Sequence, residues 1–295
     1  MFCDLNILYS TSKGAPSDDV QQSVKLASHL GYDVVALNYA MTGKVPTSGG
    51  NANPVKKVDT ANYERSIRQL TRLTVTVEES NHNYGLTSTN ALAQSYDLLA
   101  VKPTTEKGFQ HACSTLEIDI ITLDLSTRLP FYLKHTTVGQ AIDRGIYFEI
   151  GYGGAIRDNS ARRHLISNAQ ALVRVTHGKN LILSSEAQRA LELRGPYDVI
   201  NLGALFGLNQ ATAKDCVAAN GRAVILRAET RRNTYRAVVG AAPLKDLKPE
   251  EEWKLGKGAP TEKRNGKRKA EDDLARMEGG KEDRREEAKD EMDQS

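Results

Sequence analysis

Short runs of apolar and β-branched residues recur along the chain, and stretches with the three-to-four-residue spacing of amphipathic helices lie between them. Several of these runs are continuously apolar, which is typical of parallel strands that are covered on both faces. The pattern predicts strands at residues 3–9, 33–39, 69–77, 97–102, 119–125, 146–151, 180–185 and 223–228.

Helices are predicted between these strands. Ser17 and Gly31 are of the residue types that cap and end the first helix, and Ser160 and Gly178 are of those that cap and end the second. Segment 41–66 is rich in turn-forming residues and predicts a long loop. The predicted helices cover residues 18–30, residues 161–175, a segment that starts near Pro196, and residues 209–219.

Eight strands with mostly helical crossovers in about 240 residues predict an α/β fold of the (β/α) TIM-type barrel kind. A doubly wound open sheet is the alternative, because the order of strands cannot be read from one sequence. The predicted barrel domain covers residues 1–242. From residue 243 onward apolar residues almost vanish, so residues 243–295 are predicted to be a disordered charged tail. The chain has no run of 18 apolar residues, so we expect no transmembrane helix.

Charge is distributed unevenly. The formal net charge of the whole chain is +3. Residues 155–242 contain 13 Lys and Arg and 6 Asp and Glu, a net of +7, whereas residues 1–154 (13 against 15) and 243–295 (14 against 16) each have a net of −2. The basic segment indicates an anionic partner such as RNA, or a solvated basic face.

Sequence signals of catalysis and of metal binding are missing. The chain has no Gly-x-Ser-x-Gly motif, no phosphate-binding Gly-x-x-x-x-Gly-Lys-[Ser/Thr] loop and no His-x-His or His-Glu-x-x-His pair, and its three cysteines are far apart. We therefore predict no catalytic residue, no metal ligand and no cofactor. Asp4 and Asn6 are two apart on the first strand and are expected to share a face, as half of a metal site or, more commonly, as a hydrogen-bonded plug inside a barrel.

A possible phosphate site follows the sixth predicted strand. The chain there reads GYGG, and the next helix opens with Arg162 and Arg163. Cations in a first helical turn are unfavourable unless an anion is bound, so these residues, with Arg157, predict a contact with RNA phosphates. The alternative is that Asp158 or Glu149 neutralises the arginines and fixes the loop.

Four more arginines are candidates for RNA contact. Arg194 follows the seventh predicted strand and is expected at the same C-terminal face of the barrel; the alternative is a pair with Asp198 that fixes the turn. Arg227, Arg231 and Arg232 form a basic stretch at and after the predicted eighth strand.

The charged tail contains one short basic cluster, which is typical of a nuclear import signal. The alternatives are a weak RNA contact and an ordinary charged tail. The cluster consists of Lys263, Arg264, Lys267, Arg268 and Lys269.

Many blocks of the sequence, in order from residue 1 to about residue 236, together resemble one family. The chain is similar to the thirty-kilodalton protein subunits of ribonuclease P, which are shared with RNase MRP. Segment 41–66 and the tail lie outside the resemblance. The blocks are MFCDLNI, LGYDVVALNY, LTRLTVTVE, LPFYLK, AIDRGIYFEIGY, RRHLISNA, GKNLILSSEA, RGPYDVINLGALFGL and RAVILRAETRR.

The resemblance implies a barrel related to the polymerase and histidinol phosphatase superfamily. Enzymes of that superfamily bind metals through a His-x-His pair on the first strand, where this chain has Asp4-Leu5-Asn6. The resemblance therefore implies a non-catalytic scaffold within a particle whose RNA subunit holds the catalytic magnesium ions. It implies a role in 5′-end maturation of precursor tRNA and, in RNase MRP, in ribosomal RNA processing.

The resemblance also implies partners and a location. The implied partners are ribonuclease P RNA, RNase MRP RNA, a small ferredoxin-like ribonuclease P protein and other proteins of the particle, and the implied location is the nucleus, including the nucleolus. Two alternative functions stay open at this point: a metal-dependent phosphoesterase of the same barrel superfamily, and a protein-binding adaptor that never contacts RNA.

Overall fold

The computed structural model describes residues 1–12, 15–46, 53–61, 63, 65–78, 85–86, 90–235 and 239–240. The predicted tail at 243–295, with its basic cluster, lies outside the described residues, and the predicted domain boundary at residue 242 stays a prediction.

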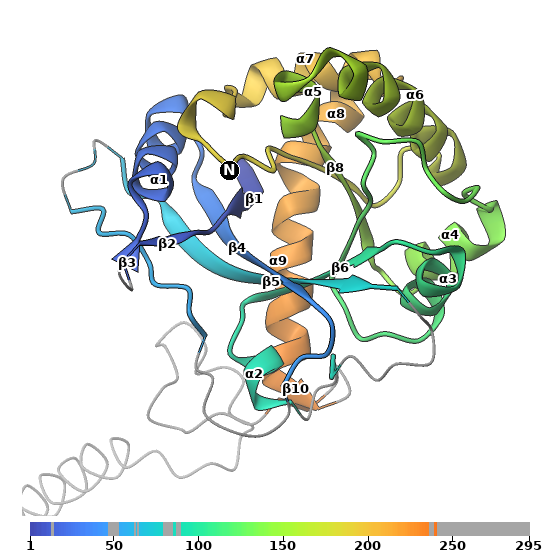
Figure 1. Cartoon of the computed structure of the whole chain (residues 1–295), viewed down its shortest axis with the longest axis horizontal. Helices are drawn as coiled ribbons and strands as arrows, with labels where there is room; N and C mark the ends of the chain where they lie inside the picture. Colours follow the sequence, from blue (N-terminus) through green and yellow to red (C-terminus); the bar gives the residue numbers. More distant parts are fainter. Residues whose placement is uncertain are drawn as a thin grey trace, which may run out of the picture. The chain divides into compact units, whose positions relative to one another are not determined.

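Seven parallel strands form one curved sheet that is nearly closed into a barrel (Figure 1). The strands lie beside one another in the order in which they occur along the chain, so the doubly wound alternative, in which the order reverses, is wrong. Between the first and last strands the barrel is joined by a single bridge between Ile7 and Ala187. The strands are β1 (Cys3–Leu8), β4 (Val34–Thr42), β5 (Arg68–Val77), β6 (Leu98–Pro103), β7 (Ile120–Thr122), β8 (Tyr147–Gly151) and β9 (Leu181–Ser184).

Most helices lie on the outside of this sheet, as expected for a (β/α) barrel (Figure 1). Two short hairpins complete the described elements: β2 (Thr11–Ser12) with β3 (Ala15–Pro16), and β10 (Thr234–Tyr235) with β11 (Val239–Gly240). The helices are α1 (Asp18–Leu30), α2 (Ala91–Gln94), α3 (Glu106–Ser114), α4 (His135–Asp143), α5 (Gly153–Arg157), α6 (Asn159–Thr176), the 3-10 helix η1 (Ala190–Glu192), α7 (Pro196–Leu205), α8 (Gln210–Val217) and α9 (Ala219–Asn233).

The predicted helix signals are confirmed in α1 and partly wrong in α6. The Ser17 hydroxyl accepts a hydrogen bond from the Val20 N–H, and Gly31 ends α1 with a φ of 95°. In α6 the capping residue is Asp158 and not Ser160, because the Asp158 carboxylate accepts from the Ala161 N–H at 3.0 Å. The predicted loop at 41–66 is confirmed for residues 43–46, 53–61, 63 and 65–66, which form no helix or strand, whereas residues 41–42 still belong to β4.

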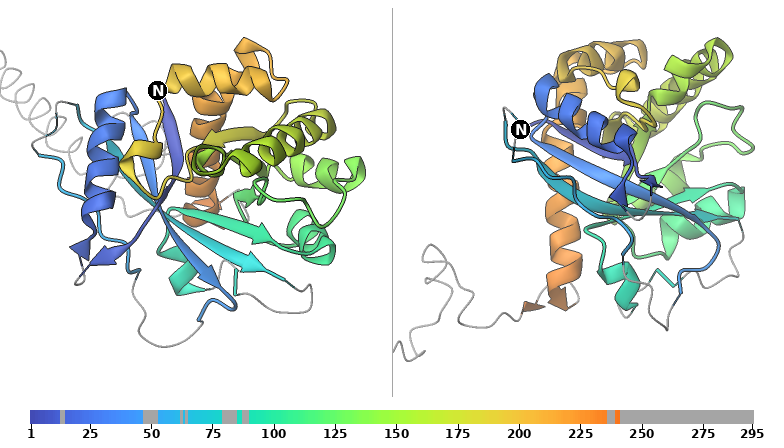
Figure 2. Two further views of the ribbon diagram at one scale, coloured as in Figure 1. Left: turned by 45° about the horizontal axis from the view of Figure 1, so that its top comes forward. Right: turned by 60° about the vertical axis from the view of Figure 1, so that its left-hand side comes forward.

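The predicted eighth strand at 223–228 is wrong, because these residues belong to helix α9. Its buried residues Val224, Ile225 and Ala228 have helical spacing, and they pack against the inner faces of the first residues of several strands. Figure 2 shows α9 crossing the barrel at the ends where the strands begin. The apolar run that suggests a strand therefore closes the N-terminal mouth of the barrel. The strand residues in this inner cluster are Cys3, Leu5, Val34, Ala36, Leu70, Leu98, Ala100, Ile120 and Ile182.

A second, larger apolar cluster lies between the outer face of the sheet and the surrounding helices, and it contains Val35, Leu37, Leu73 and Phe148. Residues next to each other on a strand thus belong to different cores, which explains why the strands read as continuously apolar. Among the described residues, no helix is long and apolar enough to cross a membrane.

Barrel interior and candidate RNA interface

A buried ion pair occupies the middle of the barrel. The Arg72 guanidinium, on β5, forms two hydrogen bonds of 2.6 Å with the two carboxylate oxygens of Glu149, on β8, and both side chains are fully buried. Burial alone would raise the pKa of Glu149, but Arg72 and the hydroxyls of Thr122 and Ser184 lower it overall. Glu149 is therefore charged at neutral pH and fully hydrogen bonded.

Asparagine and threonine side chains extend this pair across the first strands. Asn6 Nδ2 donates to Glu149 at 3.2 Å, and Asn38 Nδ2 donates to Asn6 Oδ1 at 2.7 Å. Thr74 Oγ1 then donates to Asn38 Oδ1, also at 2.7 Å, while accepting from Arg72 Nε. The interpretation of Asn6 as part of a hydrogen-bonded plug is confirmed. Because every polar group in this network has a partner, the network stabilises the interior as a unit.

Asp4 is not part of this plug, so the expectation that it shares a face with Asn6 is wrong. The pairing of β1 with β4 shifts register between Asp4 and Ile7, and this bulge breaks the alternation of side chains. Asp4 Oδ1 accepts from the backbone N–H groups of Asn6 and Ser185, whereas its Oδ2 has no hydrogen-bond partner among the described residues. Burial raises the pKa of Asp4.

The interior does not have the chemistry of a metal site. The central group is the Arg72 guanidinium, a cation that repels a metal ion, and the nearby amides bind one another. Among the described residues, no three or more His, Cys, Asp or Glu side chains are grouped as metal ligands.

The glycines of the GYGG motif have a packing role. A Cβ atom on Gly153 would lie 2.5 Å from the Ser185 carbonyl oxygen, and one on Gly154 would overlap the Ser126 hydroxyl. The start of α5 therefore approaches the ends of β7 and β9 as closely as backbone allows. This close approach accounts for the motif without a bound phosphate.

The three arginines after this motif have different surroundings. Arg157 Nη1 lies 3.7 Å from Glu192 Oε2, and Arg162 Nε donates to the Ala155 carbonyl at 2.9 Å. Arg163 is exposed and has no hydrogen-bond or ion-pair partner among the described residues. Neither of the carboxylates expected to neutralise Arg162 and Arg163 pairs with them, because Asp158 caps α6 and Glu149 lies inside the barrel. Backbone N–H groups at the start of α6 lower the pKa of Asp158.

Arg194 is also exposed, and its Nη1 donates to the carbonyls of Leu191 and Leu193 at 2.8 Å each. The alternative pair between Arg194 and Asp198 is wrong, since the guanidinium bonds to backbone oxygens of the preceding turn instead.

Three of the arginines of α9, Arg227, Arg231 and Arg232, face the barrel. Arg231 binds the fully buried carboxylate of Asp119 with Nη2–Oδ2 at 2.9 Å, and Arg232 binds Asp97. Arg227 Nη1 donates to the Arg144 carbonyl at 2.5 Å. RNA contact by Arg227, Arg231 and Arg232 stays a prediction, but their guanidinium groups already have partners within the chain.

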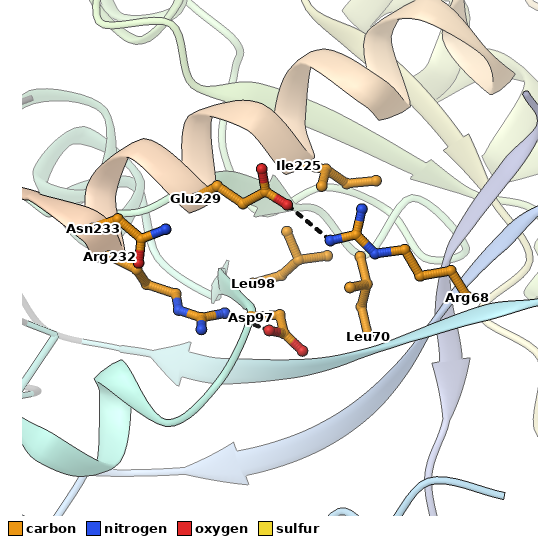
Figure 3. A pocket seen from close by; sticks show the side chains of 8 residues that line it. All are labelled: Arg68, Leu70, Asp97, Leu98, Ile225, Glu229, Arg232 and Asn233. Atoms are coloured by element: carbon orange, nitrogen blue, oxygen red, sulfur yellow. Dashed lines mark hydrogen bonds and ion pairs between the residues drawn. The ribbon is translucent and has the colours of Figure 1, made fainter. Parts of the chain in front are cut away.

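A small cleft of about 180 Å³ lies between α9 and the start of β5 and β6 (Figure 3). On one side of the cleft Arg68 forms an ion pair with Glu229, with Nη2–Oε1 at 2.8 Å, and on the other side Arg232 pairs with Asp97. Because these charges neutralise each other, the cleft fits a structural role better than it fits an anion site.

The fold and interior define a nearly closed (β/α) barrel with a structural ion pair in its middle. The family model of the RNase P subunit p30 matches residues 1–233, and the chain therefore belongs to this family of ribonuclease P protein subunits. This finding confirms the resemblance noted in the sequence.

Individual relatives agree with the family match. The chain is 41% identical over 239 residues to the probable ribonuclease P protein subunit 3 of Schizosaccharomyces pombe, covering 81% of this chain and 98% of the relative. It is 26% identical over 250 residues to the ribonuclease P/MRP protein subunit RPP1 of Saccharomyces cerevisiae, covering 81% and 84%. A chain in a cryo-EM structure of archaeal ribonuclease P with mature tRNA has the same fold, with a TM-score of 0.59 at 13% identity over 83% of this chain and 99% of that one.

Sequence reasoning missed Arg72, the central residue of the interior. The signal was present, because Arg72 stands between apolar and β-branched residues on both sides, and a second charge, Glu149, interrupts another apolar run. Two opposite charges on buried strands of one barrel indicate a pair across its interior.

Proposed function

We propose that this chain is a non-catalytic protein subunit of the ribonuclease P ribonucleoprotein, where it supports 5′-end maturation of precursor tRNA, and of RNase MRP, where it supports ribosomal RNA processing. The observation that carries the proposal is the family match over residues 1–233, which spans the whole barrel. The interior adds support, because an Arg72–Glu149 pair holds the barrel together where an enzyme of this architecture would need metal ligands.

The proposed partners are ribonuclease P RNA and RNase MRP RNA, together with the small ferredoxin-like ribonuclease P protein and other particle proteins. The net charge of +7 over residues 155–242 supports contact with RNA. Arg163 and Arg194 are exposed and stay candidates for this contact, as does Arg162 through its free guanidinium nitrogens.

The proposal is tested by affinity purification of the full chain from its own cells, followed by sequencing of the bound RNA. We expect both ribonuclease P RNA and RNase MRP RNA in the eluate. An eluate without either RNA would defeat the proposal. A second measurement addresses catalysis: the purified chain, freed of RNA, is incubated with a phosphomonoester and with precursor tRNA in the presence of Mn²⁺ or Zn²⁺. We expect no hydrolysis, and hydrolysis that depends on the metal would support the phosphoesterase alternative.

We further propose that the chain is located in the nucleus, including the nucleolus, through the basic cluster Lys263, Arg264, Lys267, Arg268 and Lys269. Replacing these five residues by Ala should move a fluorescently labelled chain to the cytoplasm. The matched control replaces five other basic tail residues by Ala and should leave the nuclear signal unchanged; equal loss in both variants would contradict a specific import signal. The control residues are Lys254, Lys257, Lys281, Arg284 and Arg285.

A further inference from the structure

Helix α6 has a basic outer face. It is the longest of the described helices and lies on the outside of the barrel (Figures 1 and 2). Its residues Leu165, Ala169 and Leu172 are buried, while Arg163 and Arg174 are exposed. These two arginines are eleven residues apart in sequence, which is close to three helical turns, so they lie on the same side of the helix about 16 Å apart along its axis.

Two further exposed cations lie next to α6. Lys179 is exposed just after the end of α6. Arg128 is exposed on the loop after β7, and Asn168 of α6 holds that loop by donating to the carbonyls of Leu125 and Thr127 at 2.9 and 2.8 Å. We call the set Arg128, Arg163, Arg174 and Lys179 the α6 basic face.

The cations of the α6 basic face have no anionic partner within the described part of the chain. No hydrogen bond or ion pair with a described residue engages their side-chain nitrogens. The sequence has no acidic residue between Asp158 and Glu186, and none between Asp124 and Asp143. Of these bordering acids, Asp158 caps α6, Glu186 lies 4.0 Å from Lys102, and Asp124 accepts from the Ser126 N–H at 3.2 Å. Asp143 is exposed and forms no ion pair with any of the four described cations. Within the described part of the chain, no ion pair therefore neutralises these four cations, whereas Arg231 and Arg232 of α9 each pair with a carboxylate.

The surface between the cations suits a phosphate backbone. The exposed side chains of α6 between Arg163 and Arg174 include the small residues Ser167 and Ala171, which allow close approach. The large apolar side chains that are strongly exposed in the described residues all lie outside α6, so the helix lacks the aromatic and aliphatic anchors that protein partners favour. Exposed cations without such anchors suit the charged backbone of a nucleic acid better than they suit a protein partner.

We propose that the α6 basic face binds the sugar–phosphate backbone of a structured RNA, reading its shape and charge and not its bases. This proposal rests on the proposed function, because it assigns one RNA-contacting surface within a ribonuclease P subunit. Contacts of this kind are electrostatic and sensitive to salt, and they position a protein on its RNA without depending on sequence.

The test compares full-length variants in their affinity for ribonuclease P RNA transcribed in vitro, at several salt concentrations. The double variant Arg163→Glu with Arg174→Glu should bind roughly tenfold or more weakly, and the slope of log affinity against log salt should become shallower by about 0.7–0.9 for each phosphate that the variant no longer neutralises. Arg163→Lys with Arg174→Lys keeps the charge and should retain most of the affinity. Thermal unfolding should be unchanged in both variants, because these side chains are exposed.

The matched control is Lys25→Glu with Lys214→Glu, which changes the net charge equally at exposed positions of α1 and α8. Affinity of the control should stay within about twofold of the wild type, since Lys25 and Lys214 lie on other helices and, under this proposal, neutralise no phosphate. An equal loss in the control and the α6 variant would overturn the proposal. So would an α6 variant that keeps its RNA affinity but loses a protein subunit from the purified particle. If the wild-type chain binds no RNA and copurifies with none, the proposed function itself fails. If the wild-type chain binds RNA but the α6 variant binds it equally well, only the proposal for the α6 basic face fails.

Discussion

Helices α6 and α9 both contain several arginines, yet they place them in opposite surroundings. In α9, Arg231 and Arg232 turn toward the barrel and meet Asp119 and Asp97, which stand at the starts of strands. In α6, Arg163 turns away from the barrel and meets no acidic group of the described chain. The difference lies in the neighbouring acids: Asp97 and Asp119 stand directly before β6 and β7 and pair with the arginines of α9, whereas no described acidic side chain pairs with Arg163.

This comparison shows why a cluster of arginines does not by itself indicate a nucleic-acid site. The partners of Arg231 and Arg232 lie more than a hundred residues earlier in the chain, so local sequence contains no sign of them. A basic segment has to be divided into paired and unpaired charges before its net charge of +7 can be interpreted.

The largest effect is expected in the barrel interior. Glu149→Gln leaves the Arg72 guanidinium buried without its counter-charge, and we expect a loss of about 3–5 kcal/mol in the free energy of unfolding. Urea denaturation followed by circular dichroism measures this loss. The double variant Arg72→Met with Glu149→Met should lose less than the sum of the single changes, because it leaves no unpaired charge. A cost below about 1 kcal/mol for Glu149→Gln would contradict a structural role for the pair.

The next effect concerns α9. Arg231→Ala leaves the buried Asp119 carboxylate with the Leu99 N–H, at 2.9 Å, as its one remaining donor among the described residues, and should lower the free energy of unfolding by about 2–3 kcal/mol. The matched control is Arg222→Ala on the same helix, where the side chain is exposed, and its change should stay within about 0.5 kcal/mol. Thermal unfolding of both variants provides the comparison, and equal shifts would show that Arg231 has no special role.

A smaller effect depends on pH. Burial raises the pKa of Asp97, but hydrogen bonds from Thr71 and from Arg232 outweigh burial and lower it overall. The stabilisation from this carboxylate is therefore fully present at pH values above the pKa of Asp97 in the unfolded chain, which is about 3.9. It is lost as the pH falls through the lower pKa that Asp97 has in the folded protein. Asp97→Asn should make the stability less dependent on pH in this acidic range, which urea midpoints between about pH 2 and pH 6 can measure. An unchanged pH profile would mean that the Asp97–Arg232 pair does not contribute.

The smallest effect on stability is expected on α6. Arg163→Ala removes an exposed side chain without a described partner, and the free energy of unfolding should change by no more than about 0.5 kcal/mol. Differential scanning calorimetry against Arg231→Ala gives the direct contrast between the two helices. A loss above about 1 kcal/mol would indicate an internal contact of Arg163 and would remove the distinction between paired and unpaired arginines.

Much of the barrel could be predicted from the sequence, because buried parallel strands are continuously apolar and their helices have clear caps. Strands β1 and β4 to β9 occur where the apolar runs predict them. Residues 223–228 show the limit of this signal: a short apolar run fits a strand or a buried helix equally well. The helical spacing of Val224, Ala228 and Arg231 becomes informative only when the run is extended into its charged end.

The interior could be predicted only in part. Asn6 was a candidate, but a bulge between Asp4 and Ile7 separates it from Asp4, and no local signal marks a bulge in that strand. Arg72 and Glu149 are 77 residues apart, and only the closure of the sheet brings them together. Contacts that form only when the sheet closes cannot be predicted from the spacing of residues along one strand.

The place where the barrel closes, between β1 and the segment after β9, has a consequence for how the chain folds during synthesis. Strand β1 is made first, but the segment that bridges it on its free side, at Ala187, emerges only after most of the domain has been translated. The helix that covers the mouth, α9, comes later still. A nascent chain that ends before α9 therefore leaves the edge of β1 and the inner cluster exposed. Because contacts distant in sequence form slowly, this stage of synthesis is the one most open to aggregation and to capture by chaperones.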